Sequence, residues 1–303
     1  MSVPIHLLSL TLTKAAPLLL AAFGGLLSEL SGVINFALEG MMLSGAFAAV
    51  LGTWLSGSPW VGLMFGAAAG MLVGALHAAA CLKFRANQIV SAIAVNLLAA
   101  GVTGLLLNQL FGVYGTSPGV TGLPDLSSFL PGNTPAGVRT FAEGLSVLVP
   151  AALLFALITI VFLRSTVPGL RLRACGENQQ AARAAGIRVD LVRFLALCGG
   201  GALAGMGGAF LSIGEISQFV ENMTQGRGYL AIAAVILGRW RPGGVFFAVL
   251  FFGFSQALSE WLAVRWSSLP DQVFLVLPYA ACFAVLAFYA GKHLQPTALG
   301  RVD

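Results

Sequence analysis

The chain has 303 residues, of which 58% are hydrophobic and only 9% are charged. Soluble domains carry about 25% charged residues, so the composition excludes an ordinary soluble protein and predicts that lipid is the solvent. The net charge of +5 is therefore interpreted by its location in loops and not as a sign of nucleic-acid binding.

Nine apolar runs follow one another along the chain, separated by polar or Gly/Pro-rich breaks. A straight membrane span needs about 20 residues. The run 227–238 is too short to cross alone, so it either extends into the polar stretch before it or forms a broken helix that lines a cavity. The runs lie near 8–28, 36–55, 60–82, 89–111, 143–163, 191–213, 227–238, 245–264 and 273–290.

The basic residues form four groups, which nine spans would place on one side of the membrane. Because cytoplasmic loops collect Lys and Arg, this side is assigned to the cytoplasm. The N-terminus and the loop 112–142 are then expected outside, while Lys14 and Arg265 fit this arrangement less well. The groups are Lys83 with Arg85; Arg164, Arg171, Arg173, Arg183, Arg188 and Arg193; Arg239 with Arg241; and Lys292 with Arg301.

A weak internal repeat links the segments that begin at Gly24 and Gly207. Each runs from a glycine pair through a polar break into a small-residue helix ending in Gly-x-Trp. The nine-span topology gives the two copies opposite orientations, which is typical of a transport pathway at the interface of inverted repeats. Chance similarity between Gly/Ala-rich spans is the alternative. We expect one domain, 1–303, with a first repeat at about 8–111, a linking region at 143–190 and a second repeat at 191–290.

Glycines recur at every fourth position in one predicted span, and this spacing puts them on a single helix face. Such a groove lets a neighbouring helix approach closely, so we expect it to be scaffold. The glycines are Gly62, Gly66, Gly70 and Gly74, and Gly201 and Gly205 repeat the spacing later in the chain.

Four polar side chains in or beside interrupted apolar runs are the candidates for a substrate pathway. They are Asn35, Glu39, Asn96 and Asn222. Polar groups in hydrocarbon are costly, so they face the bundle interior or a wet cavity. The alternative is that they cap broken helices and bond only to neighbours.

Several features of the sequence argue against an enzyme. No nucleophile–base pairing is recognisable, and the four cysteines lack metal-ligand spacing. No Gly-x4-Gly-Lys-Ser/Thr occurs, because the only lysines are Lys14, Lys83 and Lys292. We therefore expect no catalytic residue, no metal and no cofactor in this chain.

The stretch "GLRLRACGENQQAARAAGI", 169–187, is a short polar segment inside an apolar chain. Pro168 and Gly169 are expected to end the preceding span. Asn178 can cap a two-turn helix with Glu177 near its positive end, and Gly186 fits the position after its last residue. A helix this short is marginal in water, so it either docks on a partner surface or is a lone helix in a loop.

This stretch resembles the coupling segment of permease subunits of ATP-binding-cassette (ABC) importers in the branched-chain amino acid, ribose and nucleoside group. The segments "LSELSGVINFALEGMMLSGAF", "NQIVSAIAVNLLAAGVTGLLL" and "NMTQGRGYLAIAAVILGRWRPGG" resemble the nucleoside-uptake branch. The sugar branch carries Gly-Ile-Asp-Leu-Ser-Val-Gly where this chain has "GVINFALEG". That departure argues against ribose or galactose.

The resemblance implies an all-α polytopic fold of the type II ABC importer class, with two inverted repeats and broken helices. It implies import of nucleosides across the bacterial cytoplasmic membrane, with ATP bound and hydrolysed on a separate subunit. That subunit would dock on Gly176, Glu177, Asn178, Ala182, Arg183 and Gly186.

The other implied partners are a second, different permease chain and an external substrate-binding lipoprotein or periplasmic protein. Three alternatives stay open: a permease of the same group for a sugar, amino acid or other small solute, an ion-coupled secondary transporter, and a membrane scaffold without a pathway.

Overall fold

The structure, a computed structural model, describes residues 3–131, 134–266, 271–288 and 295–300. Within these ranges the chain is helical, without a β-strand. The helices, in chain order, are α1 (Val3–Leu30), α2 (Leu38–Ser56), α3 (Pro59–Ala78), η1 (Ala79–Lys83), α4 (Gln88–Phe111), η2 (Leu126–Phe129), α5 (Ala136–Ala142), α6 (Leu148–Ser165), α7 (Val167–Glu177), α8 (Gln179–Ala184), α9 (Val189–Ala209), η3 (Phe210–Ile216), α10 (Arg227–Leu237), α11 (Pro242–Arg265) and α12 (Asp271–Phe288).

Seven of the described helices are long and apolar enough to cross a membrane. They correspond to the first six predicted runs and to the run near 245–264. The run 227–238 is the 11-residue helix α10, which confirms that it is too short to cross alone. The last run, 273–290, overlaps α12, which has 18 residues. A multi-pass all-α membrane fold is therefore confirmed, whereas the count of nine spans stays a prediction.

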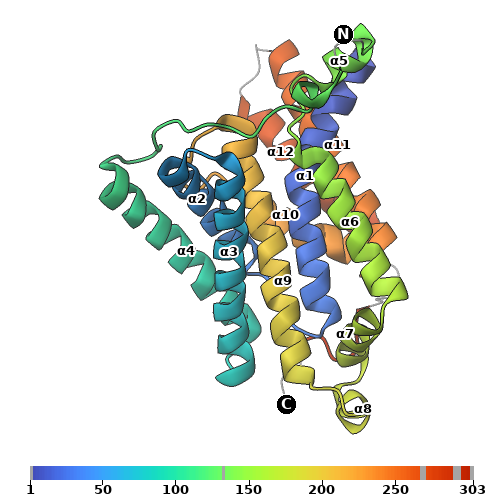
Figure 1. Cartoon of the computed structure of the whole chain (residues 1–303). Helices are drawn as coiled ribbons and strands as arrows, with labels where there is room; N and C mark the ends of the chain where they lie inside the picture. The colour runs from blue at the N-terminus through green and yellow to red at the C-terminus, as the bar shows by residue number, and fades with distance from the viewer. Residues whose placement is uncertain (1–2, 132–133, 267–270, 289–294, 301–303) are drawn as a thin grey trace.

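Helices α1 and α9 form the centre of the bundle, and α3, α6, α10 and α11 pack around them (Figure 1). One end of the molecule carries the N-terminal end of α1, the loop after α4 and α5. The opposite end carries the α3–α4 connection, α7 and α8. Thus the first two predicted basic groups lie at one end; Lys292 and Arg301 of the fourth lie outside the described residues.

The close packing of α3 on α9 depends on the predicted glycine face. A Cβ atom at Gly70 would lie 2.2 Å from the Gly201 carbonyl oxygen and 2.6 Å from the Cα of Gly205. Backbones at this separation leave no room for a side chain. Close contacts of this kind hold helices together in a membrane, where the hydrophobic effect does not drive their association because lipid is itself apolar. The expectation that these glycines are scaffold is confirmed, because all four of the series in α3 are buried.

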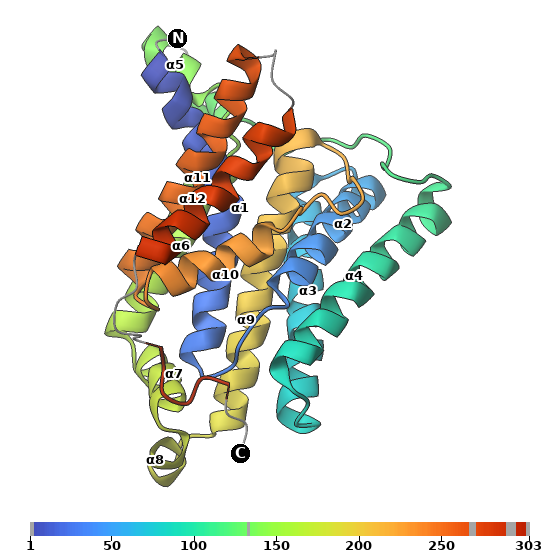
Figure 2. The ribbon, with the colours of Figure 1, turned by 180° about the vertical axis from the view of Figure 1, so that it is seen from behind.

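Two irregular segments interrupt the bundle, one before α2 and one before α10. The second contains three non-glycine residues with left-handed backbone, Ser217, Asn222 and Gln225. Such conformations are uncommon outside glycine, and here they reverse the chain so that α10 lies across α1 (Figure 2). These are the two polar breaks of the sequence repeat.

Candidate functional site

The N-terminal ends of α2 and α10, the helices that follow the two irregular segments, meet each other. Glu39 in the first turn of α2 accepts hydrogen bonds from the backbone N–H groups of Gly226 (2.8 Å) and Gly228 (2.7 Å) at the start of α10. The residue before α10 is Gly226, which has no side chain to cap the helix. A carboxylate from another helix therefore satisfies the exposed N–H groups and faces the positive end of the helix dipole.

Gly228 makes this contact possible. A Cβ atom there would lie 2.4 Å from the backbone nitrogen of Glu39, so any larger residue would push the two helix ends apart. Gly228, the second glycine of "GRGYLA", is thus explained by a close approach of two helices, which requires the absence of a side chain.

Asn96 of α4 caps α2 in a similar way. Its side-chain oxygen accepts from the Gly40 N–H at 2.8 Å, and its amide nitrogen donates to the Phe36 carbonyl at 2.9 Å and to the Tyr229 hydroxyl at 3.0 Å. The residue preceding α2 is Ala37, which provides no side-chain cap. Asn96 therefore stabilises the start of α2, and Glu39 of α2 in turn stabilises the start of α10.

Asn35 lies apart from these two residues. It is fully buried, and its amide nitrogen donates to the Ser28 hydroxyl at 2.9 Å. Nearby, the Trp240 ring N–H donates to the Glu29 carboxylate at 2.5 Å. Of the four predicted pathway residues, the structure thus brings Glu39 and Asn96 to one helix junction and buries Asn35 in another hydrogen-bonded cluster.

Asn222 borders a cavity of about 440 Å³ between α4 and the segment before α10. Small residues of α4 make room for it: a Cβ at Gly101 would meet nothing within 4 Å, and one at Gly104 would meet only the carboxylate of Glu221. Asn96 lies one helical turn before Ala100, which lines this cavity. The polar side chains that line it are Thr103, Asn108, Tyr114, Glu221 and Asn222.

These groups can recognise a neutral, hydroxyl-rich solute. Amides offer both donors and acceptors, and the Glu221 carboxylate offers two acceptor oxygens. Tyr114 adds an exposed ring on which a flat group can stack. The backbone N–H of Glu221 donates to the Gly115 carbonyl at 2.8 Å, and Thr116 pairs with Val220, which tie the loop after α4 to this segment.

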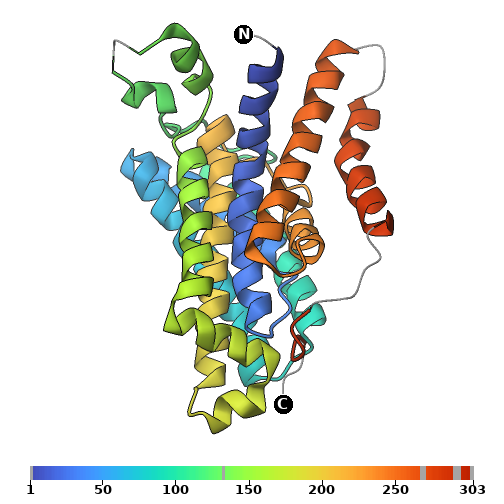
Figure 3. The ribbon, with the colours of Figure 1, turned by 90° about the vertical axis from the view of Figure 1, so that its right-hand side faces the viewer.

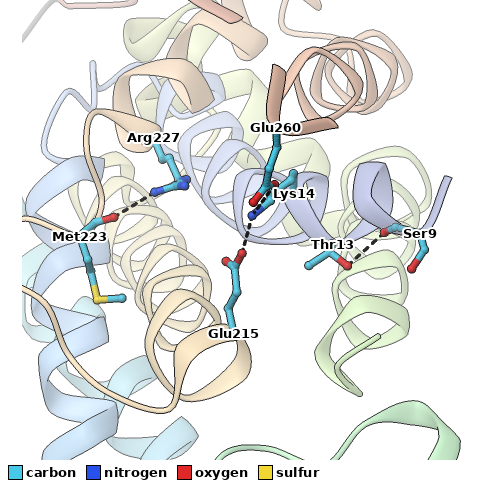
Figure 4. Close-up of polar contacts among 7 residues, drawn as sticks. All are labelled: Ser9, Thr13, Lys14, Glu215, Met223, Arg227 and Glu260. Carbon is cyan, nitrogen blue, oxygen red and sulfur yellow. Dashed lines mark hydrogen bonds and ion pairs between the residues drawn. The ribbon is translucent and has the colours of Figure 1, made fainter. Parts of the chain in front are cut away.

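A charged cluster that sequence reasoning missed lies between α1, η3 and α11 (Figure 4). The Lys14 ammonium lies 2.5 Å from Glu215 and 3.1 Å from Glu260, and only 14% of the lysine side chain is exposed. Charges inside a membrane fold pair with each other. Lys14 lies inside a helix and pairs with acidic residues of helices far apart in sequence. This pairing explains why Lys14 does not fit the distribution of the basic residues in the loops.

A short helix, α8, is present at the position predicted for the coupling helix. Asn178 closes α7 and caps α8, because its side-chain oxygen accepts from the Ala181 N–H at 3.0 Å. Gly186 follows the helix with left-handed backbone (φ +79°). The expectation that Pro168 and Gly169 end the preceding span is wrong. The span α6 ends at Ser165, and Pro168 lies in the first turn of α7, where proline is favoured because the N–H it lacks would have no helical partner.

The residues that are predicted to contact the ATP-binding subunit face different directions. Ala182 is only 4% exposed and packs on Cys175 and Val189 of the same chain, whereas Glu177, Asn178, Arg183 and Gly186 are exposed. Burial raises the pKa of the Cys175 thiol, which keeps it a neutral packing group. A docking surface on α8 would therefore be its outer face and not the methyl group of Ala182.

Gly176 is an internal contact of the fold. A Cβ there would lie 2.2 Å from the carbonyl oxygen of Leu30 at the end of α1. Its own carbonyl accepts from the Ala298 N–H at 2.8 Å, and the Thr297 hydroxyl donates to the Glu177 carbonyl. The Gly300 N–H donates to the Gly32 carbonyl at 3.1 Å. The C-terminal segment 295–300 thus bridges the coupling segment and the break before α2.

Comparison with known proteins identifies the family. Residues 7–286 match the family described as branched-chain amino acid transport system / permease component. The chain is 35% identical to a guanosine ABC transporter permease protein of Bacillus subtilis, covering 96% of this chain and 93% of that protein. It is 34% identical to a nucleoside ABC transporter permease protein of Lactococcus lactis (95% and 93% covered).

A third relative, a glucose ABC transporter permease protein of Haloferax volcanii, is 32% identical (81% and 68% covered). Each of the three is a permease component of an ABC transporter by name, and the family match extends from α1 into α12. The chain therefore belongs to the permease-component family of branched-chain amino acid transport systems.

Proposed function

We propose that this chain is the transmembrane permease subunit of an ATP-driven importer that moves nucleosides across the bacterial cytoplasmic membrane. The observation that carries the proposal is the 35% identity, over 96% of the chain, to a permease named for guanosine. The polar cavity bordered by Asn222 supports it, because amide and carboxylate side chains complement the base edges and ribose hydroxyls of a nucleoside.

The order of helices supports an inverted repeat. Helices α1 to α4 and helices α9 to α12 each contain a long span, an irregular segment and three further helices. The linking helices α6 to α8 lie between the two sets. In this proposal nine spans place the N-terminus outside and the C-terminus inside, and the end bearing α7 and α8 faces the cytoplasm.

The pathway is proposed to begin at the cavity beside Asn222 and to pass the junction of α2 and α10. Glu39 and Asn96 form the frame of this junction, because their side-chain oxygens are already occupied by backbone N–H groups. The side chains of Asn222 and Glu221 line the cavity and make no hydrogen bond to another described residue, so they are the proposed substrate contacts. Asn35 is proposed to stiffen the break before α2 from within.

No bond chemistry is assigned to this chain. ATP is bound and hydrolysed on a separate cytoplasmic subunit, which docks on the exposed face of α8. An external binding protein, anchored by lipid or free in the periplasm, delivers substrate to the opposite end. A second, different permease chain completes the membrane part. Closure of the ATP-binding subunits then moves α8 and rocks the two halves.

A sugar is the second candidate substrate, since a glucose permease is 32% identical. The two candidates differ in the flat base, which only a nucleoside can place on the ring of Tyr114. Uptake of labelled guanosine in cells expressing all subunits, competed by unlabelled nucleosides or by glucose, separates them. Competition by glucose and not by nucleosides would contradict the nucleoside proposal.

Cavity variants test the site. Replacing one bonded partner in a substrate contact costs about 1.5–3 kcal/mol when the group is charged, so Glu221→Gln should lower apparent affinity about ten- to hundredfold. Asn222→Ala should also weaken uptake. Gln109→Ala is the control, since Gln109 is exposed on α4, the helix that forms the other wall of the cavity, but does not line the cavity. Equal effects of all three substitutions would remove the cavity from the pathway.

A further inference from the structure

A groove of about 800 Å³ lies at the end of the molecule that carries α7 and α8. Helices α6 and α9 both pack on α1 and run beside it, above α7 and α8 (Figure 3). Leu27 of α1 lines the groove between them. Its walls are almost wholly apolar and include Ile158, Phe162, Leu172, Leu191, Leu195 and Ala196.

The groove opens on a lipid-facing side of the bundle. Ile158 and Leu195 are 51% and 59% exposed, and they belong to two of the helices that can span the membrane. Apolar side chains exposed on such helices contact acyl chains, because the bilayer core is their solvent. The groove is therefore accessible to acyl chains along α6 and α9.

The depth of the groove matches one leaflet. Along α9 its lining runs from Arg188 to Gly199, and at 1.5 Å per residue this corresponds to about 16 Å. The hydrocarbon core of a bilayer is about 30 Å thick, so one leaflet contributes about 15 Å. A segment of a cytoplasmic subunit would have to leave water to enter so far, whereas an acyl chain lies at this depth already.

Two arginines line the groove at its end nearest α8. Arg171 comes from α7 and Arg188 precedes α9, and both are exposed. Within the described ranges neither lies within 4 Å of an acidic side chain, since the ion pairs there involve Lys14, Arg139 and Arg183. Guanidinium groups bind phosphate bidentately, and basic pockets between helices on the cytoplasmic side bind anionic lipid headgroups.

We propose that an anionic phospholipid of the cytoplasmic leaflet occupies this groove. One acyl chain lies between α6 and α9, and the phosphate contacts Arg171 and Arg188. Ala185, Gly186 and Ile187 line the same groove, so the lipid fastens the end of the coupling helix α8 to the bundle. The assignment to the cytoplasmic leaflet rests on the orientation proposed above, whereas the binding itself does not depend on which solute is carried.

Lipid retention tests the proposal directly. Native mass spectrometry of the importer complex, purified from membranes containing phosphatidylglycerol, should detect this lipid on the wild type. Arg171→Gln combined with Arg188→Gln should reduce its occupancy at least tenfold. Arg173→Gln is the matched control, because Arg173 is exposed on the same helix but does not line the groove. Unchanged retention in the double variant would overturn the proposal.

A second variant blocks the chain and leaves both arginines in place. A Cβ at Gly199 would meet nothing within 4 Å, so Gly199→Leu can fold and projects into the groove. It should also lower phosphatidylglycerol retention, because the space for the acyl chain is lost. If only the arginine variant loses lipid, the site holds a phosphate without a chain, which contradicts the proposal. Inorganic phosphate and glycerol phosphate should not replace the lipid.

The effect on coupling separates a lipid from a protein partner. In nanodiscs of phosphatidylcholine, adding phosphatidylglycerol should raise substrate-stimulated ATP hydrolysis of the wild type at least twofold and leave the double variant unchanged. If the double variant instead loses the ATP-binding subunit equally in both lipids, the arginines contact that subunit and the lipid proposal fails. Lipid retention without transport of any nucleoside would contradict only the proposed function.

Discussion

Replacing Glu39 should destabilise the junction of α2 and α10. Its carboxylate accepts two backbone hydrogen bonds, 2.8 and 2.7 Å long, from Gly226 and Gly228. Hydrogen bonds to a charged group contribute about 1.5–3 kcal/mol each, so Glu39→Ala should lower the free energy of unfolding by about 3–6 kcal/mol. Both N–H groups would then lack a partner at the start of α10.

Glu39→Gln should have about half this effect. A glutamine side chain has one oxygen acceptor, and its NH₂ group would face the second N–H as another donor. Unfolding of the purified permease in mixed SDS–detergent micelles, followed by tryptophan fluorescence, measures the change. Glu143→Gln is the control, because the exposed pair between Glu143 and Arg139 spans 3.8 Å and such pairs contribute about 0–1 kcal/mol.

The opposite result would refute the cap. If Glu39→Ala unfolds like the wild type and changes only the affinity for substrate, the carboxylate is a substrate contact and not a helix cap. If both variants are destabilised equally, the charge is important and the two-acceptor geometry is not.

Three further predictions concern packing, coupling and orientation. Gly70→Ala should cost about 1–3 kcal/mol of stability by overpacking, because its methyl group meets the backbone of α9; a Tm equal to that of the wild type would contradict this. Ala182→Trp should destabilise the permease itself, whereas Ala181→Trp, on the exposed face of α8, should leave the fold intact and abolish co-purification of the ATP-binding subunit; normal co-purification would exclude this face as the docking surface. An impermeant maleimide should label Gly119→Cys but not Gln180→Cys in intact cells, and the reverse pattern would invert the topology.

Local features of the fold could be predicted from the sequence because their causes are local. Asn178 and Gly186 delimit α8 through a cap and a left-handed residue within a few positions. The glycine face of α3 could be predicted from the recurrence of glycine at every fourth position alone. The shortness of α10 follows from the length of one apolar run.

Contacts between distant segments could not be predicted in this way. Nothing near Glu39 in the sequence indicates that it caps α10, since the N–H groups it binds are 187 and 189 residues away. The pairing of Lys14 with Glu215 depends on how α1 meets η3. The inward direction of Ala182 likewise depends on where α7 and α9 place Cys175 and Val189.

ATP-driven uptake by the reconstituted complex tests the central proposal most directly. Proteoliposomes would contain this chain, its partner permease and the ATP-binding subunit, with ATP enclosed on the side of that subunit and the binding protein with labelled guanosine on the other. The proposal predicts accumulation that requires ATP and is absent when the ATP-binding subunit is omitted. Uptake by this chain alone under an ion gradient would contradict it.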